Sequence, residues 1–409
     1  QSEPAPLHPG ILSKKVTAAV LRKTLGVGQQ RPSPNMLFNI TYELNAKLGG
    51  ENHRVSPEDF ALLLTQPGRL ASPCVVIGVA YGQARCRKGS GTAAMHAVMM
   101  SATADRHGFR HLADYRQVVE LERPKLEGGG RHSMVRTGFS NGKAERDLAA
   151  SILRKWIEVN GAVPRRIVVL LHDVKADEAS FARALECQVR AVEDACVDLS
   201  DFILQMFPPP SGGGMPVDVQ ALYDDGQPIP GTAGWAPPVV VLAGSRTNLR
   251  MYPGGGREGR VADAKGNVPA GTVIEDFTPM AAGSTRRCFC ITPQAGLMGT
   301  KKVSAYYELR NDEAIPLDAL KRLVNTLSHC YARCPRAISL PSPLAYALRV
   351  YERLSAAMKM DGFQGLGGAG AGQSDAASTG GGSDAASEVQ VDVVAVHPAL
   401  RRIDCMYYV

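Results

Sequence analysis

Residues 331–346 read YARCPRAISLPSPLAY. This stretch sets arginine and serine side chains between apolar residues, and the apolar positions can hold the end of a helix and a strand. Donors carried on rigid elements can fix a phosphate group of a nucleic-acid backbone, which a flexible basic tail cannot do. The stretch therefore predicts a phosphate contact that is built into the fold.

The composition around this stretch is that of a globular protein. Of the 409 residues, 44% are hydrophobic and 21% are charged, which suits two or three structural units with a large core. The net charge of +7 is compatible with a basic groove for nucleic acid, although a solvated basic surface explains it equally well. No apolar run approaches the roughly 18 residues of a membrane-spanning helix, so we expect no membrane association.

The nine cysteines stand at irregular spacings. The pairs Cys288/Cys290 and Cys330/Cys334 lack the spacing of a zinc site, and we expect no metal there. The N-terminal residues are polar and rich in proline, unlike a signal peptide. We therefore expect reduced, mostly buried thiols in a cytoplasmic or nuclear protein.

Strands and helices are predicted to alternate along the chain. Apolar runs bounded by proline or glycine predict strands at 73–82, 95–100, 115–121, 166–171 and 239–242, the first three as an antiparallel meander. Amphipathic patterns predict helices over 11–25, 35–48, 147–159, 178–199, 317–332 and 343–358. This order favours an α/β fold in which helices cover a sheet. Residues 208–238 and 364–388 are rich in glycine, proline or serine and are predicted to be loop insertions.

Seven stretches, in order along the chain, resemble segments of eukaryotic Argonaute proteins. Residues 331–346 resemble the YxRCxRxxSIPxPxYY signature of the Piwi domain, and the other six stretches are residues 45–53, 76–79, 171–181, 266–276, 293–302 and 405–409. The resemblance implies an RNase H-like Piwi domain over residues 51–409, with a mixed sheet flanked by helices. It implies that residues 1–50 are the C-terminal part of a Mid-like domain and a linker.

The resemblance also identifies where the family's nuclease site would lie. Active members hold two Mg²⁺ ions with an Asp-Glu-Asp set completed by His or Asp, and those positions fall on Ala80, Lys143, Asp173 and Leu348. A single carboxylate cannot organise two ions, so the resemblance implies a fold that has lost target cleavage and its catalytic metals. An alternative stays open in which Glu145, after a register shift, joins Asp173 and a substitute such as Asp105 or Asp114.

The family holds the 5′ phosphate of a guide RNA at the boundary between its Mid and Piwi domains. The residues matching that pocket are Gln29, Lys47, Arg333 and the C-terminal carboxylate of Val409, and any Mg²⁺ would be expected only at this phosphate. A second pocket lysine of the family falls on Glu43, which reverses the charge.

Contacts along the guide backbone form a further matched set. Its members are cations, a hydroxyl and a tyrosine in register with the family's donors: Arg246, Arg250, Lys301, Lys302, Ser339 and Tyr346. The family's RHHTR stretch is replaced by GSRTNLR at residues 244–250, with half of its donors lost.

The resemblance implies a small-RNA-guided silencing protein. Such a protein would bind a guide RNA, a complementary target RNA and proteins of a silencing pathway, without cutting the target. A second reading is a scaffold that keeps the fold but no longer binds RNA. A third is a divergent Mg²⁺-dependent RNA endonuclease.

Overall fold

The computed structural model describes residues 34–48, 50, 52, 74–88, 91–104, 111–121, 142–174, 176–207, 223–224, 227–228, 235–254, 262–263, 266–275, 286–296 and 300–358. Several sequence predictions lie outside these residues: the helix at 11–25, the insertion at 364–388, and any contacts of Gln29, Asp105 and Val409. Within the described part of the chain, no helix combines the length and apolarity needed to cross a membrane.

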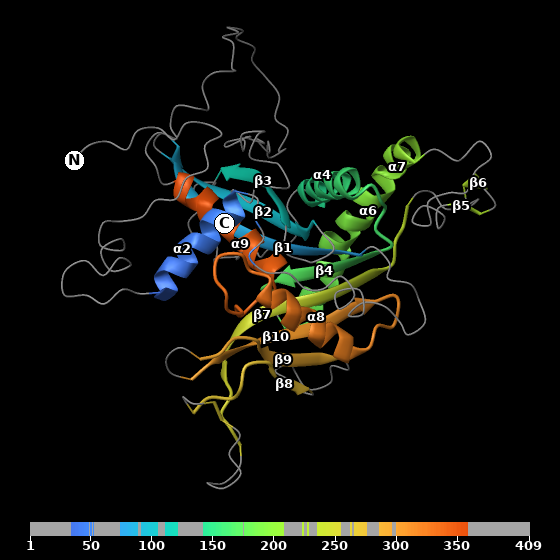
Figure 1. Cartoon of the computed structure of the whole chain (residues 1–409). Coiled ribbons are helices and arrows are strands. Elements are labelled where there is room, and N and C mark those ends of the chain that lie inside the picture. The colour runs from blue at the N-terminus through green and yellow to red at the C-terminus, as the bar shows by residue number, and fades with distance from the viewer. Residues whose placement is uncertain are drawn as a thin grey trace.

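One mixed sheet of eight strands organises the chain (Figure 1). In spatial order its strands are β3 (His111–Leu121), β2 (Gly91–Thr103), β1 (Cys74–Lys88), β4 (Arg166–His172), β7 (Val239–Arg250), β10 (Lys302–Asn311), β9 (Cys288–Thr292) and β8 (Thr272–Glu275). The central strands β1, β4 and β7 run parallel, and the outer neighbours pair antiparallel. A separate two-stranded pair, β5 (Tyr223–Asp224) and β6 (Gln227–Pro228), falls inside the predicted 208–238 insertion.

Strand β4 shows why the centre of the sheet is apolar on both sides. Residues of its RIVVLLH run alternate between two cores: Ile167 and Val169 face one, and Val168 and Leu170 face the other. A strand covered by helices on both faces carries a continuous apolar run rather than an alternating one. The predicted α/β class with a mixed, helix-flanked sheet is confirmed.

The first face of the sheet is covered by α4 (Lys143–Asn160) and by a helical stretch that follows β4. That stretch comprises α5 (Glu178–Arg183), the π-helical segment η2 (Ala184–Val189), α6 (Arg190–Asp198) and α7 (Ser200–Met206). Asp177 caps α5, because its carboxylate accepts a hydrogen bond from the N–H of Ser180 at 2.8 Å. The helix predicted over 178–199 is thus present, with a π-helical segment inside it.

The opposite face carries α8 (Leu317–His329) and α9 (Ser342–Met358), with α2 (Pro34–Lys47) beside α9 (Figure 1). Two glycines of β1 allow α9 to lie directly on the strand. A Cβ atom on Gly78 would sit 2.4 Å from the carbonyl carbon of Pro343, and one on Gly82 would sit 2.1 Å from the ring of Tyr351. Helix α9, whose first residues belong to the 331–346 stretch, therefore fits against β1 because β1 lacks side chains at both points.

The segment between α8 and α9 corrects one expectation. Helix α8 ends at His329 rather than at 332, and residues 330–341 form bends and turns instead of the expected strand. Its backbone groups bond elsewhere: the N–H of Ile338 donates to the carbonyl of Ser328 at 2.9 Å, and the Ser304 hydroxyl donates to the carbonyl of Ser339 at 2.6 Å. A segment whose backbone is satisfied this way has no strand partner and needs none.

Candidate nucleic-acid interface

Four of the predicted guide-backbone residues line one polar pocket at the edge of β7 and β10. The pocket has a volume of about 340 Å³, and the four residues are Arg246, Lys301, Lys302 and Ser339. Arg246 lies opposite Ser304 in the pairing of β7 with β10, which brings the arginine beside the start of β10. Residues 246, 301–302 and 339 are far apart in sequence, so the sheet and the turn before α9 create this cluster.

Neutral oxygens, not carboxylates, orient the two lysines of this pocket. The ammonium of Lys302 donates to the side-chain oxygen of Asn248 at 2.9 Å, and that of Lys301 donates to the carbonyl of Val268 at 3.0 Å. Burial lowers the pKa of Lys301, against the raising effect of Asp263. Among the described residues, neither of these lysines nor Arg246 forms an ion pair with a carboxylate. The pocket therefore keeps positive charge that an anion could use.

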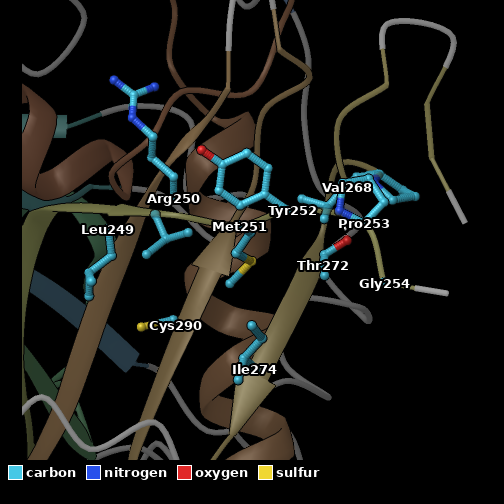
Figure 2. Close-up of a pocket in the computed structure, with 12 residues that line it drawn as sticks. Leu249, Arg250, Met251, Tyr252, Pro253, Gly254, Val268, Thr272, Ile274 and Cys290 are labelled. Atoms are coloured by element: carbon cyan, nitrogen blue, oxygen red, sulfur yellow. Dashed lines mark hydrogen bonds between the residues drawn. The ribbon is translucent and has the colours of Figure 1, made fainter. Parts of the chain in front are cut away.

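Arg250 lies at the junction between this pocket and a second, apolar one (Figure 2). Its guanidinium donates to the carbonyl of Thr300, a residue of the polar pocket, at 2.6 Å. The apolar pocket has a volume of about 610 Å³, and Met251, Ile274 and Cys290 are among its walls.

Sequence reasoning missed the most exposed aromatic residue of this region. Tyr252 is 69% exposed and stands over the apolar pocket, as Figure 2 shows. An exposed ring next to a cationic pocket is a surface on which a nucleic-acid base can stack. The available signal was an aromatic residue two positions beyond a predicted arginine, but exposure could not be read from the sequence.

A second cluster of predicted residues lies where α2 meets the turn after α8. The Lys47 ammonium lies 3.3 Å from one carboxylate oxygen of Glu43, and the Arg333 guanidinium donates twice to the other oxygen, at 3.1 and 3.2 Å. Glu43 and Lys47 are each only 4% exposed. Burial lowers the pKa of Arg333, but its contacts with Tyr331 and Glu43 hold that pKa above the ordinary value. Both predicted phosphate-binding cations thus have Glu43 as a partner.

Tyr346, the last of the described guide-contact candidates, lies in the protein interior. Its side chain is fully buried, and its ring packs against those of His111 and Tyr331 with centroids 4.6 and 5.1 Å apart. Its phenolic oxygen accepts a hydrogen bond from the N–H of Ala332. The structure therefore gives Tyr346 a role in holding the turn that carries Arg333.

The four positions that match the family's nuclease site differ in burial and in the charge of their side chains. Ala80 is buried against α9, Leu348 is packed between the two cores on that same face, and Lys143 is exposed at the start of α4. Asp173 is exposed just after β4 with φ of 56°, and its N–H donates to the carbonyl of Gly244 at 2.9 Å. Left-handed backbone is unusual for a residue other than glycine, although aspartate tolerates it better than most.

Glu145, the substitute carboxylate, faces a different direction from Ala80. Its side chain is fully buried and accepts a hydrogen bond from the Tyr81 hydroxyl at 3.2 Å. Burial, and then the neighbouring Glu145, raise the pKa of Tyr81 well above its ordinary range. Tyr81 packs toward the α4 core while Ala80 packs toward α9, because neighbouring strand residues point to opposite faces.

These positions do not fit a pair of magnesium ions. Three of the four matched residues offer no carboxylate, and the buried carboxylate of Glu145 lies on the far side of β1 from Ala80. Within the described residues, no three side chains of His, Cys, Asp or Glu are grouped as metal ligands. The seven described cysteines carry thiols, and burial raises the pKa of Cys74 and of Cys290 to about 12.

The chain matches one protein family over part of its length and is similar to plant Argonaute proteins. The Piwi domain family matches residues 233–359. Protein argonaute MEL1 of Oryza sativa subsp. japonica is 24% identical over 323 residues, which cover 78% of this chain and 26% of the rice protein. Protein argonaute 12 of the same plant is 25% identical over 201 residues, or 49% of this chain and 15% of the relative. The chain thus spans about a quarter or less of the length of these relatives.

Two solved structures share the fold over 91% of the chain. Kluyveromyces polysporus Argonaute with a guide RNA superposes with a TM-score of 0.60 at 19% identity, and the match covers 34% of that chain. The C-terminal lobe of a budding yeast Argonaute superposes with a TM-score of 0.58 at 19% identity, and the match covers 60% of that chain. At these identities the likeness shows the fold alone.

Proposed function

Since this chain is an Argonaute-family protein with a Piwi domain, we propose that it is a small-RNA-guided silencing protein that holds a guide strand without cutting the target. The observation that carries the proposal is the polar pocket, where Arg246, Lys302 and Ser339 converge from three separate segments. Its two lysines donate to neutral oxygens, so a phosphate would meet positive charge that forms no ion pair with a described carboxylate.

A pocket of this kind suits the backbone of a single strand. Phosphate contacts carry no sequence information, so they can hold any guide while its bases stay available for pairing with a target. Tyr252 lies beside Arg250 at the neighbouring pocket and offers a face for one base. One protein of the same fold, the Kluyveromyces polysporus Argonaute, was solved with a guide RNA, which supports the same class of ligand here.

The residues at the four nuclease positions support the loss of target cleavage. Ala80 and Leu348 are apolar and packed, Lys143 carries the wrong charge, and only Asp173 could bind a cation. Cleavage by a two-metal site needs several carboxylates converging on both ions. We therefore propose that silencing depends on proteins recruited to the paired target, in the cytoplasm or the nucleus.

A scaffold that has lost RNA binding is the second candidate. One specific observation favours it: Glu43 already pairs with Lys47 and Arg333, two cations that the family resemblance assigns to the guide. The altered stretch at residues 244–250 points in the same direction.

Two assays on the purified 409-residue chain test the proposal. The first measures the affinity for single-stranded RNA over a range of salt concentrations. We expect the logarithm of the association constant to fall linearly with the logarithm of the salt concentration. The slope should be about −0.7 for each phosphate contacted. Binding that is absent, or that is insensitive to salt, would favour the scaffold.

The second assay mixes the guide-loaded chain with a complementary target and Mg²⁺. We expect the target to stay intact. Cleavage that needs Mg²⁺ and disappears in Asp173→Ala would contradict the loss of nuclease activity, whereas cleavage that survives this substitution would indicate a contaminating nuclease.

A further inference from the structure

The cations of β7 and β10 lead from the polar pocket toward the apolar one. In the pairing of these strands Arg246 lies opposite Ser304, and Arg250 lies opposite Lys302, so the two pairs are two residues apart on β10. Two strand residues span about 7 Å, which is comparable to the step between neighbouring nucleotides of an extended single strand. An RNA strand with one phosphate at Arg246 would therefore bring its next phosphate to Lys302 and Arg250.

Arg250 keeps positive charge at the junction of the two pockets. It lines the apolar pocket, and its guanidinium donates to the carbonyl of Thr300, which lines the polar pocket, at 2.6 Å. Of the ion pairs formed within the described part of the chain, none includes Arg250. A guanidinium carries several N–H donors, so the bond to Thr300 leaves others for a phosphate. The junction thus favours an occupant that carries a phosphate beside an apolar part.

The wall of the apolar pocket suits an aromatic ring. Met251, Cys290 and Val303 form a buried part of this wall, and none of the described residues that line the pocket is acidic. Sulfur atoms make favourable contacts with aromatic rings. Met251 and Cys290 therefore favour a flat aromatic group over an aliphatic chain, and a nucleobase is such a group.

Tyr252 offers a stacking surface on the open side of this pocket. Its side chain is largely exposed and stands over the pocket, as Figure 2 shows. Leu249 and Ile274 are exposed apolar residues of the same pocket. A base that entered here would contact the tyrosine ring on one side and the buried wall on the other, and it would cover apolar surface that now faces water.

We propose that the apolar pocket is a base-binding subsite, which takes one unstacked nucleobase of the RNA strand that the polar pocket holds. This proposal rests on the proposed RNA-binding function. The ligand is a nucleotide within single-stranded RNA, with its phosphate at Lys302 and Arg250 and its base against Tyr252. Because stacking does not distinguish the bases strongly, the subsite accepts any of them. The base that it holds is withdrawn from pairing with a target.

The test compares a single-stranded RNA with an oligomer of abasic sugar phosphates of equal length, which keeps the backbone charge but has no bases. The affinities of both are measured for the wild-type chain, for Tyr252→Ala and for Tyr252→Phe, which keeps the stacking surface. Met206→Ala, at an exposed methionine of α7, is the matched control for the loss of an exposed apolar side chain. Thermal melting checks that each variant is folded.

We expect Tyr252→Ala to bind the RNA at least about 5-fold more weakly than the wild type does, as for one lost base–aromatic stack, and to bind the abasic oligomer within about 2-fold of the wild type. Tyr252→Phe and Met206→Ala should stay within about 2-fold of the wild type for both oligomers. The proposal is overturned if Tyr252→Ala binds the RNA as tightly as the wild type does, or if it weakens both oligomers equally. Either result would favour a different occupant, such as an apolar side chain of a partner protein.

Photocrosslinking of the wild-type chain to RNA that contains 4-thiouridine tests whether the base enters the pocket. We expect mass spectrometry to find crosslinks at Tyr252 and at Met251 or Cys290 of the buried wall. Crosslinks at Tyr252 with none at the buried wall would overturn the insertion of the base.

The affinities also separate this proposal from the proposed function. If the wild type and every variant bind the RNA and the abasic oligomer equally well, only the base-binding subsite is contradicted, and the phosphate-binding function stands. If the wild type binds neither oligomer, both are contradicted.

Discussion

The phenolic oxygen of Tyr346 accepts a hydrogen bond from the backbone N–H of Ala332 at 2.8 Å, and both residues are completely buried. This bond joins the first turns of α9 to the beginning of the segment that follows α8. Arg333 is the next residue, so its side chain leaves the backbone from a point that Tyr346 fixes. The buried tyrosine thus shapes the candidate interface without touching its surface.

Tyr346→Phe should destabilise the protein, because it leaves the buried N–H of Ala332 without its acceptor. We expect the free energy of unfolding to fall by about 1–3 kcal/mol. Urea denaturation measures the change, and Tyr252→Phe at an exposed tyrosine is the control, expected to stay within about 0.5 kcal/mol of the wild type. Equal stability of Tyr346→Phe and wild type would show that the bond contributes nothing.

Gly78→Ala should also destabilise the fold, for a steric reason. The added methyl would lie 2.4 Å from the carbonyl carbon of Pro343, so α9 must move away from β1. Forcing extra atoms into a packed core typically costs about 1–3 kcal/mol. Gly254→Ala is the matched control, because a Cβ there meets nothing within 4 Å. A Gly78→Ala protein as stable as Gly254→Ala would contradict the close approach of helix and strand.

Arg246→Ala and Lys302→Ala should each weaken the binding of single-stranded RNA by a similar factor for every RNA sequence, because both face a backbone pocket. Each substitution should make the slope of the logarithm of the association constant against the logarithm of salt concentration shallower by about 0.7, the value for one lost phosphate contact. Arg190→Ala on the exposed side of α6 removes the same charge elsewhere and should leave the slope unchanged. A sequence-dependent loss in either pocket variant would indicate base contacts instead.

Asp312 should make stability depend on pH in the acid range. Its carboxylate accepts hydrogen bonds from the N–H of Val239 at 2.9 Å and from Arg310 at 2.8 and 2.9 Å. Burial alone would raise its pKa, but the bonds from Arg310 and Val239 hold that pKa below the ordinary 3.8. The folded state therefore binds this proton less readily than the unfolded state, and the stabilisation is complete above that value and lost as the pH falls through the folded pKa.

Asp312→Asn is the variant that isolates this effect. At neutral pH we expect it to be less stable than the wild type by about 1.5–3 kcal/mol, the range for hydrogen bonds to a charged group. The difference should shrink as the pH falls below about 4, because the wild type then loses the charge as well. Unfolding curves at pH 7, 5, 4 and 3 measure it, with Asp201→Asn on the exposed side of α7 as the control. A difference that is constant with pH would exclude Asp312 as the titrating group.

Much of the sheet was predictable because its centre has a strong pattern. The RIVVLL run of β4 is buried on both sides, and glycine or proline bounds the neighbouring runs. The strands β8, β9 and β10 were not predicted. Strand β9 has only five residues, CFCIT, all buried, and a short apolar run of that kind does not distinguish a strand from a buried turn.

The candidate site was predictable in composition but not in arrangement. The resemblance to Argonaute proteins matched Lys47 and Arg333 to two cations of the family's phosphate pocket, and it matched Glu43 to a lysine of that pocket, which reverses the charge. It could not show that all three meet, because that depends on how α2 packs against a turn 290 residues away. Similarly, Tyr346 stood within a recognisable stretch, but only the packing of α9 shows that its ring points inward.

The two close contacts between α9 and β1 share one spacing. Gly78 and Gly82 are four residues apart on a strand, a distance of about 13 Å, and Pro343 and Tyr351 are eight residues apart on a helix, a distance of about 12 Å. The two contact points are therefore spaced almost equally along the strand and along the helix. Inserting or deleting one residue between either pair would set a strand residue with a side chain, instead of a glycine, against the helix. This stretch of both elements should therefore tolerate substitutions far better than changes in length.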